Sequence, residues 1–293
     1  MKYLERFSTI IYRTAARKPL MRFNEITPEK VLQRSLKVVD TDTVDKVRTF
    51  VIKQQTESGG FMDKAGKSDL YYSLFGYLLA EVLNLATIRP RIRQYLRDIT
   101  QTTLPDGVYF HCAAILFAKL ADAENIPPEI CSRIRAKADY SGNMDAYSTF
   151  LSLLTFYYTE NYKNLFHVGH HLKNLQKAPG TPCTTTAAIL VLKYCFEEPA
   201  EETIAALRAF YMENGSFAAV KNAPVGDLLS TAVALYALRV ARADIRKIAP
   251  DCLAYVDSLY LNGGFCATAL DQDPDVEYTF YGLLALGALS GES

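Results

Sequence analysis

The fold of this chain is decided by the stretch 59-GGFMDKAGKSDLYYS-73 and by its counterpart 263-GGFCATALDQDPDVEYT-279. Each stretch begins with Gly-Gly-Phe, continues to Asp-x-x-Tyr and a hydroxyl residue, and then enters an apolar run of helical length. Weaker versions of the same phrase lie between the two. A phrase that returns along the chain in this way indicates an array of structural repeats.

The period of the array is measured between the small or polar residues that open each apolar run. Consecutive members are separated by 38, 38, 37, 45 and 48 positions. These residues are Ser73, His111, Thr149, Thr186, Thr231 and Thr279. Six units of about forty residues are therefore predicted, which is a usual length for a helical hairpin repeat.

Each unit is expected to hold two helices of different character. The apolar runs carry little charge and are predicted to be buried inner helices; they cover residues 74–83, 112–120, 150–158, 187–194, 232–240 and 280–289. The segments before them have apolar residues three and four positions apart, which is typical of amphipathic outer helices; they cover residues 44–53, 92–99, 128–134, 165–175, 204–211 and 253–261. No segment shows the two-residue alternation of a sheet.

Closure of the array into a ring is favoured over an open superhelix. A nearly uncharged inner helix needs neighbours on most sides, whereas an open superhelix would leave one concave face in water. We predict an all-α fold, an α/α toroid (α6/α6 barrel) of six helical hairpin repeats. The toroid domain is predicted at 44–293, after an N-terminal helical extension at 1–43.

The composition excludes several classes of protein. The 32 basic and 32 acidic residues give no net field that would attract nucleic acid. The longest uncharged apolar run, residues 281–289, is too short for a membrane span. Six scattered cysteines without a Cys-x-x-Cys pair suit free thiols in a reducing compartment. A soluble, cytoplasmic protein is expected.

The first 23 residues form a separate basic segment. Six lysines and arginines stand against the single acid Glu5, with apolar residues interleaved. A basic amphipathic helix can lie on a membrane surface or act as an organelle presequence. The other interpretation is a helix that caps the barrel and keeps its basic side in solvent.

Residues 59–73 resemble the protein prenyltransferase segment Gly-Gly-x-x-Asp-Lys-Pro-Gly-Lys-x-x-Asp-x-Tyr-His-Thr. The chain is thus similar to the superfamily of prenyltransferase β-subunits and squalene-terpene cyclases, whose α/α toroid is built from such hairpins, and the likeness covers nearly the whole array. The resemblance implies that the three zinc ligands of the family correspond to Tyr72, Asp275 and Glu277, with Tyr72 here in place of His and Glu277 in place of Cys. With two of three ligands altered, neither zinc binding nor standard protein prenylation is expected.

The two best phrases lie in the first and the last unit, which are neighbours in a closed ring. We therefore expect Asp69, Tyr72, Asp275 and Glu277 to meet at the mouth of the barrel. The acidic run containing Asp273, Asp275 and Glu277 could coordinate Mg²⁺ together with a diphosphate, or hold a protonated acid that starts a cyclisation. The alternative is a loop whose acids cap the following helix.

Other residues near the starts of the inner helices are candidates for contact with a substrate. Lys64 and Lys67 match family positions in a turn where cations can meet a diphosphate. Aromatic and histidine side chains at helix starts could line an apolar cavity or stabilise carbocations. The candidates of this kind are Tyr71, Tyr72, Tyr109, His111, Tyr147 and Tyr278. Core packing explains such rings equally well, and a relocated zinc site at His111, Cys112 and Cys183 is the weaker alternative.

The resemblance implies an isoprenoid-handling enzyme that acts on a prenyl diphosphate or a prenylated small molecule. In that interpretation Asp273, Asp275, Glu277 and Tyr72 are catalytic, Lys64, Lys67 and Asp69 bind substrate, and the aromatic residues shape the cavity. The alternative function is a non-catalytic toroid that acts as a binding or scaffold protein. The altered metal ligands favour this alternative, whereas the lysine turn and the acidic run favour the enzyme.

Overall fold

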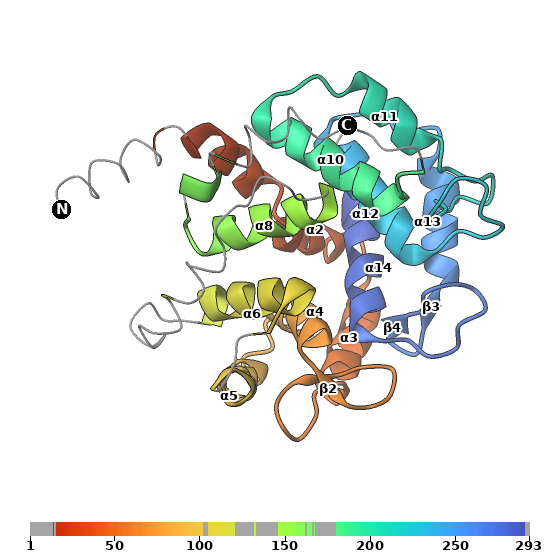
Figure 1. Cartoon of the computed structure of the whole chain (residues 1–293). Coiled ribbons are helices and arrows are strands. Elements are labelled where there is room, and N and C mark those ends of the chain that lie inside the picture. Colours follow the sequence, from red (N-terminus) through yellow and green to blue (C-terminus); the bar gives the residue numbers. More distant parts are fainter. Residues whose placement is uncertain are drawn as a thin grey trace.

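The structure is a computed structural model that describes residues 14, 16–101, 105–120, 132, 146–161, 163–165, 167 and 180–290, with only the backbone of 146–148. Figure 1 shows its helices arranged around a common centre. The inner helices are α4 (Leu70–Val82), α6 (Gly107–Leu120), α8 (Ala146–Tyr158), α10 (Cys183–Phe196), α12 (Leu228–Val240) and α14 (Val276–Leu289). The described outer helices are α3 (Thr41–Lys53), α5 (Ile88–Thr100), α11 (Glu201–Arg208) and α13 (Ala249–Ser258).

The inner helices form a closed ring. Each contacts the next along the chain, from α4 to α14, and α14 contacts α4 in turn. The predicted α/α toroid is therefore confirmed. The outer helices expected at 128–134 and 165–175 fall almost entirely outside the described residues.

The inner helices begin earlier than the apolar runs suggested, because an aspartate caps three of them. Asp69 accepts hydrogen bonds from the backbone N–H groups of Tyr71 and Tyr72 at the start of α4. Asp227 and Asp275 cap α12 and α14 in the same way. Such caps satisfy backbone donors that have no partner within the helix. The residues used to measure the period consequently lie inside the first turn.

The hydroxyl residue of each repeated phrase holds the Gly-Gly-Phe turn of its own unit. The backbone N–H of Phe61 donates to Ser73 Oγ at 2.8 Å. The same bond joins Phe217 to Thr231 Oγ1 at 2.9 Å and Phe265 to Thr279 Oγ1 at 3.1 Å. All three hydroxyl residues are completely buried. The recurrence of a hydroxyl residue 12 or 14 positions after the phenylalanine therefore has a structural cause within this chain.

Replacing Thr231 by valine is expected to destabilise the protein by about 1–3 kcal/mol, because the buried N–H of Phe217 loses its acceptor. Denaturant unfolding measures the change. Thr231→Ser keeps the hydroxyl and is expected to cost less. If the serine and valine variants lose equal stability, the hydrogen bond is not the cause.

Each Gly-rich turn also packs on the outer helix of the following unit. A Cβ added at Gly59 would lie 2.3 Å from the carbonyl oxygen of Arg91 in α5, and one at Gly215 would lie 2.1 Å from that of Asp251 in α13. At Gly263 the nearest atom is the carbonyl oxygen of Lys46, in α3 of the first unit. The turn of the last unit thus packs on the first outer helix, which closes the outer layer as well.

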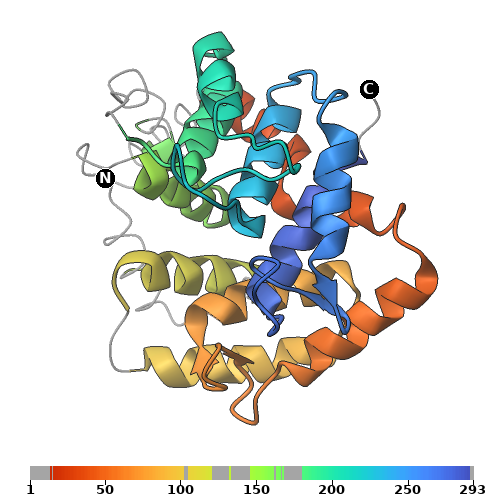
Figure 2. The same cartoon turned by 90° about the vertical axis from the view of Figure 1, so that its right-hand side faces the viewer.

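Two short hairpins accompany these turns. Strand β1 (Phe61–Met62) pairs with β2 (Ser68–Asp69), and β3 (Tyr260–Leu261) pairs with β4 (Gly264–Phe265), both antiparallel. These hairpins differ from the prediction of no sheet, because two-residue strands are too short to show an alternating pattern in the sequence. Figures 1 and 2 show the two hairpin regions near one another although they come from opposite ends of the chain.

Helix α2 (Pro28–Ser35) closes the end of the ring where the inner helices finish. It contacts α14 and α4, and Figure 1 shows it near the middle of the ring. Glu29 accepts hydrogen bonds from Lys119 Nζ at 2.6 Å and from the Tyr158 hydroxyl at 2.8 Å. These partners end α6 and α8, so α2 is tied to the base of the ring by charge as well as by packing.

Little of the basic N-terminal segment is described. Residues 16–25 are helical, and Lys18 and Arg22 pair with Glu197. Residues 1–13 lie outside the described part, so the expected membrane or partner contact stays a prediction. None of the described helices is long and apolar enough to cross a membrane.

Candidate functional site

A cavity of about 420 Å³ lies inside the ring. All six inner helices contribute to its wall, and most of the contributing side chains are apolar. At one end it is lined by residues in the first turns of the inner helices, such as Tyr71 and Leu229. At the other end it is lined by Tyr158 and Tyr236, in the later turns of their helices, and by Pro28 of α2. The centre of the ring is therefore hollow and is bounded by α2 at its base.

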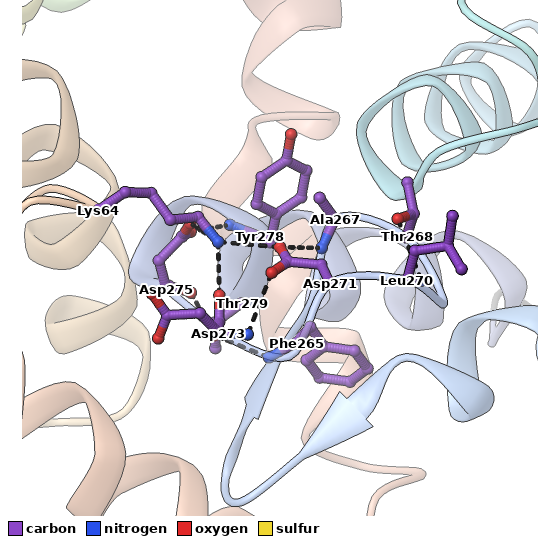
Figure 3. A network of polar contacts seen from close by, with 10 residues as sticks. All are labelled: Lys64, Phe265, Ala267, Thr268, Leu270, Asp271, Asp273, Asp275, Tyr278 and Thr279. Atoms are coloured by element: carbon purple, nitrogen blue, oxygen red, sulfur yellow. Dashed lines mark hydrogen bonds and ion pairs between the residues drawn. The ribbon is translucent and has the colours of Figure 1, made fainter.

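Polar residues gather at the opposite end, where the inner helices begin. Figure 3 shows Lys64 reaching toward the segment that precedes α14. Its Nζ lies 2.9 Å from Asp271 Oδ2 and 3.2 Å from Asp275 Oδ2, and it donates to the carbonyl of Asp273. Lys64 and Asp271 are 207 positions apart in the sequence. These ion pairs join the first unit to the last across the seam of the ring.

The charge state of Lys64 follows from these partners. Partial burial opposes its positive charge, but the hydrogen bonds and negative charges of Asp271 and Asp275 outweigh this and raise its pKa. Burial raises the pKa of Asp275, against the opposing effects of the Tyr278 N–H and of Lys64. Lys64 is therefore a cation whose charge is already balanced within the protein.

Tyr71 connects the polar mouth to the cavity. It lines the cavity, and its hydroxyl donates to Glu277 Oε1 at 2.7 Å. Glu277 is only 8% exposed. Burial raises the pKa of Glu277 to about 7, and the charges of Asp275 and Asp69 act in the same direction, whereas the Tyr71 hydrogen bond and Lys64 oppose it. A carboxyl group that is partly protonated near neutral pH thus stands one hydroxyl away from the cavity.

Tyr72, Tyr109 and Tyr278 lie around the mouth and are not part of the cavity wall. The Tyr109 hydroxyl donates to Asp69 Oδ2 at 3.0 Å, and Lys64 Nζ lies 5.8 Å from the centre of the Tyr278 ring. Burial and the nearby charges of Asp275 and Glu277 raise the pKa of Tyr72. Burial raises the pKa of Tyr278 to about 12.

Of the remaining predicted residues, His111 lies apart from this cluster, whereas Asp273 belongs to it through its backbone. His111 lines the cavity, shares a hydrogen bond of 2.7 Å with Thr155 Oγ1, and has its pKa lowered to about 4 by burial. Lys67 is exposed in the turn before β2, and Asp273 is exposed before α14. The backbone of Tyr147 belongs to α8, but its side chain lies outside the described residues.

Several cavity residues were not predicted. The rings that join Tyr71 in the wall are those of Phe75, Phe150, Tyr158, Tyr236, Phe280 and Tyr281. In α4, Phe75 lies one turn after Tyr71, so both point inward, whereas Tyr72 is rotated by about 100°. Helical spacing counted from Tyr71 would have found Phe75.

Among its described residues, the site offers no cluster of side chains suited to a metal ion. The described part of the chain holds no group of three or more His, Cys, Asp and Glu side chains placed to bind a metal ion. Cys112 and Cys183 are buried thiols whose pKa values are raised by burial. That effect disfavours the thiolate form that zinc requires. The absence of zinc stays a prediction.

Comparison with known families agrees with this geometry. The model of the prenyltransferase alpha-alpha toroid domain matches residues 14–112 and 183–292, more than half of the chain. The chain therefore belongs to this family, and its resemblance to the prenyltransferase and terpene-cyclase superfamily is confirmed. A search of curated proteins gave no match.

Proposed function

We propose that this protein is an isoprenoid-handling enzyme that holds the apolar chain of a prenylated small molecule or a prenyl diphosphate inside the ring. The cavity carries this proposal. Its volume of about 420 Å³ lies within the range of roughly 300–1,000 Å³ found for small-molecule sites, and its wall is mostly apolar. Its few polar groups, such as Tyr71 and His111, would orient the ligand.

The chemistry that this site supports best is proton transfer to the ligand. When Glu277 is protonated, its proton can pass to the Tyr71 oxygen while the Tyr71 proton passes to an alkene or epoxide in the cavity. That transfer leaves Glu277 as the carboxylate and creates a carbocation on the ligand. The π faces of Phe75, Phe280 and Tyr281 would stabilise this charge.

A prenylated molecule without a diphosphate fits the mouth better than a prenyl diphosphate does. Five carboxylates support this choice, because Asp69, Asp271, Asp273, Asp275 and Glu277 all lie at or near the mouth. Lys64 is already paired, and Lys67 is the other lysine of the turn. A diphosphate would therefore need Mg²⁺ to offset the carboxylates.

A cytoplasmic location completes the proposal and is supported by five buried free thiols among the described residues.

The alternative is a non-catalytic toroid that binds a ligand or a partner without turning it over. The observation that favours it is the internal pairing of Lys64, which stabilises the seam of the ring and leaves this lysine less suited to a diphosphate. Both functions use the cavity, so turnover separates them.

The test uses calorimetric titration with farnesol, and with farnesyl diphosphate in the presence and absence of Mg²⁺. Ala188→Phe places a ring in the cavity wall and is expected to weaken binding by at least about ten-fold, or 1.4 kcal/mol. Ala205→Phe makes the same change on the exposed face of α11 and is expected to bind normally. If neither probe binds the wild type, the isoprenoid proposal is wrong.

Product analysis with bound probe then tests catalysis. Glu277→Gln is expected to bind the probe but to form no product. A wild-type protein that binds and forms no product supports the non-catalytic alternative.

A further inference from the structure

A second pocket lies at the base of the ring, at the end opposite the acidic mouth. Its volume is about 190 Å³, or about six water volumes. It is formed by α2 together with the last turns of α12 and α14 and by Tyr194 of α10. Tyr236 lines both this pocket and the apolar cavity, and its hydroxyl donates to the carbonyl of Ile26 at 2.7 Å. One side chain thus separates the two spaces.

Three arginines line this pocket, namely Arg34, Arg239 and Arg242, and the one carboxylate among its described lining residues is the exposed Glu25. Arg239 is held in place by bonds to the carbonyls of Ala288 and Leu289, at 2.8 and 3.4 Å. The side chains of Arg34 and Arg242 form no ion pair or hydrogen bond with the described residues. Two guanidinium groups without a direct partner among the described residues therefore line one small pocket.

The arginines also act on one another. Burial lowers the pKa of Arg239, and the positive charge of Arg34 adds to this effect. Arg34 is half-buried, so water screens the repulsion less than it would on an open surface. Like charges held together in a concave site lower the stability of the empty protein and are relieved when an anion binds.

We propose that this basal pocket binds an oxyanion of the phosphate class, either free or as the head group of a larger molecule. The planar guanidinium fork matches phosphate oxygens in a bidentate manner, which suits arginine better than lysine. The position of the pocket makes it distinct from the mouth, where carboxylates outnumber lysines. It does not depend on what the apolar cavity binds.

Thermal unfolding of the whole chain with inorganic pyrophosphate, compared with sodium chloride at equal ionic strength, tests the proposal. Pyrophosphate is expected to raise the wild-type unfolding temperature saturably. Arg34→Gln is expected to abolish this rise and to raise the unfolding temperature of the protein without anion, because it removes an unpaired like charge. If Arg34 acted only by stabilising the C-terminus of α2, Arg34→Gln would instead lower the unfolding temperature of the protein without anion, because the helix would lose that stabilisation.

Arg97→Gln is the matched control, because Arg97 is an exposed arginine in the last turn of α5. It should keep the full response to pyrophosphate. Arg242→Gln provides a second variant at an exposed position, should the Arg34 variant fold poorly. Sedimentation with phosphatidylcholine vesicles, with and without phosphatidic acid, identifies the source of the phosphate.

Binding of pyrophosphate that both pocket variants lose supports a free anion. Binding only to phosphatidic acid vesicles with the same dependence on Arg34 and Arg242 supports a lipid head group. Absence of both responses, or responses that all variants retain, overturns the proposal.

Discussion

Replacing Gly215 by alanine is expected to destabilise the protein by more than about 3 kcal/mol and to lower its unfolding temperature by roughly 10 °C. Two costs add at this position. Gly215 has φ +85°, which an alanine adopts only with strain, and its new Cβ would lie 2.1 Å from the carbonyl oxygen of Asp251 and 2.3 Å from the carbonyl carbon. The obstructing atoms are backbone atoms of α13, so a side-chain rotation cannot relieve the contact.

Gly66→Ala separates the two costs. Gly66 has φ +75°, but no atom lies within 4 Å of its added Cβ. In this control only the backbone conformation is strained, so the free energy of unfolding is expected to fall by only about 1 kcal/mol. Denaturant unfolding of both variants gives the comparison. Similar losses for Gly66→Ala and Gly215→Ala would show that the turn does not press on the next outer helix.

The sequence identified the architecture because the repeated phrase has a direct structural counterpart. The glycine lets the turn approach the neighbouring outer helix, the aspartate caps the inner helix, and the hydroxyl binds the turn. In the fifth unit these roles fall to Gly215, Asp227 and Thr231. All three interactions are local or join adjacent units, so they leave a pattern at fixed spacing.

The mouth was predicted for a related reason. Closure of the ring makes the first and last units neighbours, which brings Lys64 to Asp271 and Tyr71 to Glu277. The pairing itself was not predicted, and Lys64 was assigned to a diphosphate although it meets carboxylates of its own chain. The pairing of side chains between two units depends on their rotamers and on small rotations of the helices. Neither can be predicted from the spacing of residues in the sequence.

The basal pocket had no signal in the sequence. Arg34 looks like an ordinary residue on an amphipathic helix, and Arg239 and Arg242 look like charges at a helix end. Only the packing of α2 against α14, which joins residues from the two ends of the chain, brings these arginines together. A contact of that kind cannot be read from local periodicity.

Replacing Glu277 by glutamine is expected to remove much of the loss of stability that the protein shows between about pH 5 and pH 7. Burial raises the pKa of Glu277 from 4.5 to about 7. Between these values the folded protein holds a proton that the unfolded chain releases, so stability falls as the pH rises. The full shift corresponds to about 3 kcal/mol, which is present below pH 4.5 and lost above pH 7.

Glutamine stays neutral and can still accept a hydrogen bond from Tyr71 through its amide oxygen. Glu277→Gln should therefore be more stable than the wild type at pH 8 by up to about 3 kcal/mol, and close to it at pH 5. Urea unfolding at both pH values measures this difference. Glu201→Gln, on the exposed face of α11, should leave the pH dependence unchanged.

The sign of this difference also bears on the proposed chemistry. A buried acid that resists ionisation lowers the stability of the folded protein at neutral pH, and no ion pair of Glu277 within the described residues offsets the cost. The same resistance keeps a transferable proton beside Tyr71 and the cavity. If wild type and Glu277→Gln show the same slope of stability against pH, Glu277 is ionised throughout, and the proton donor of the proposed reaction is lost.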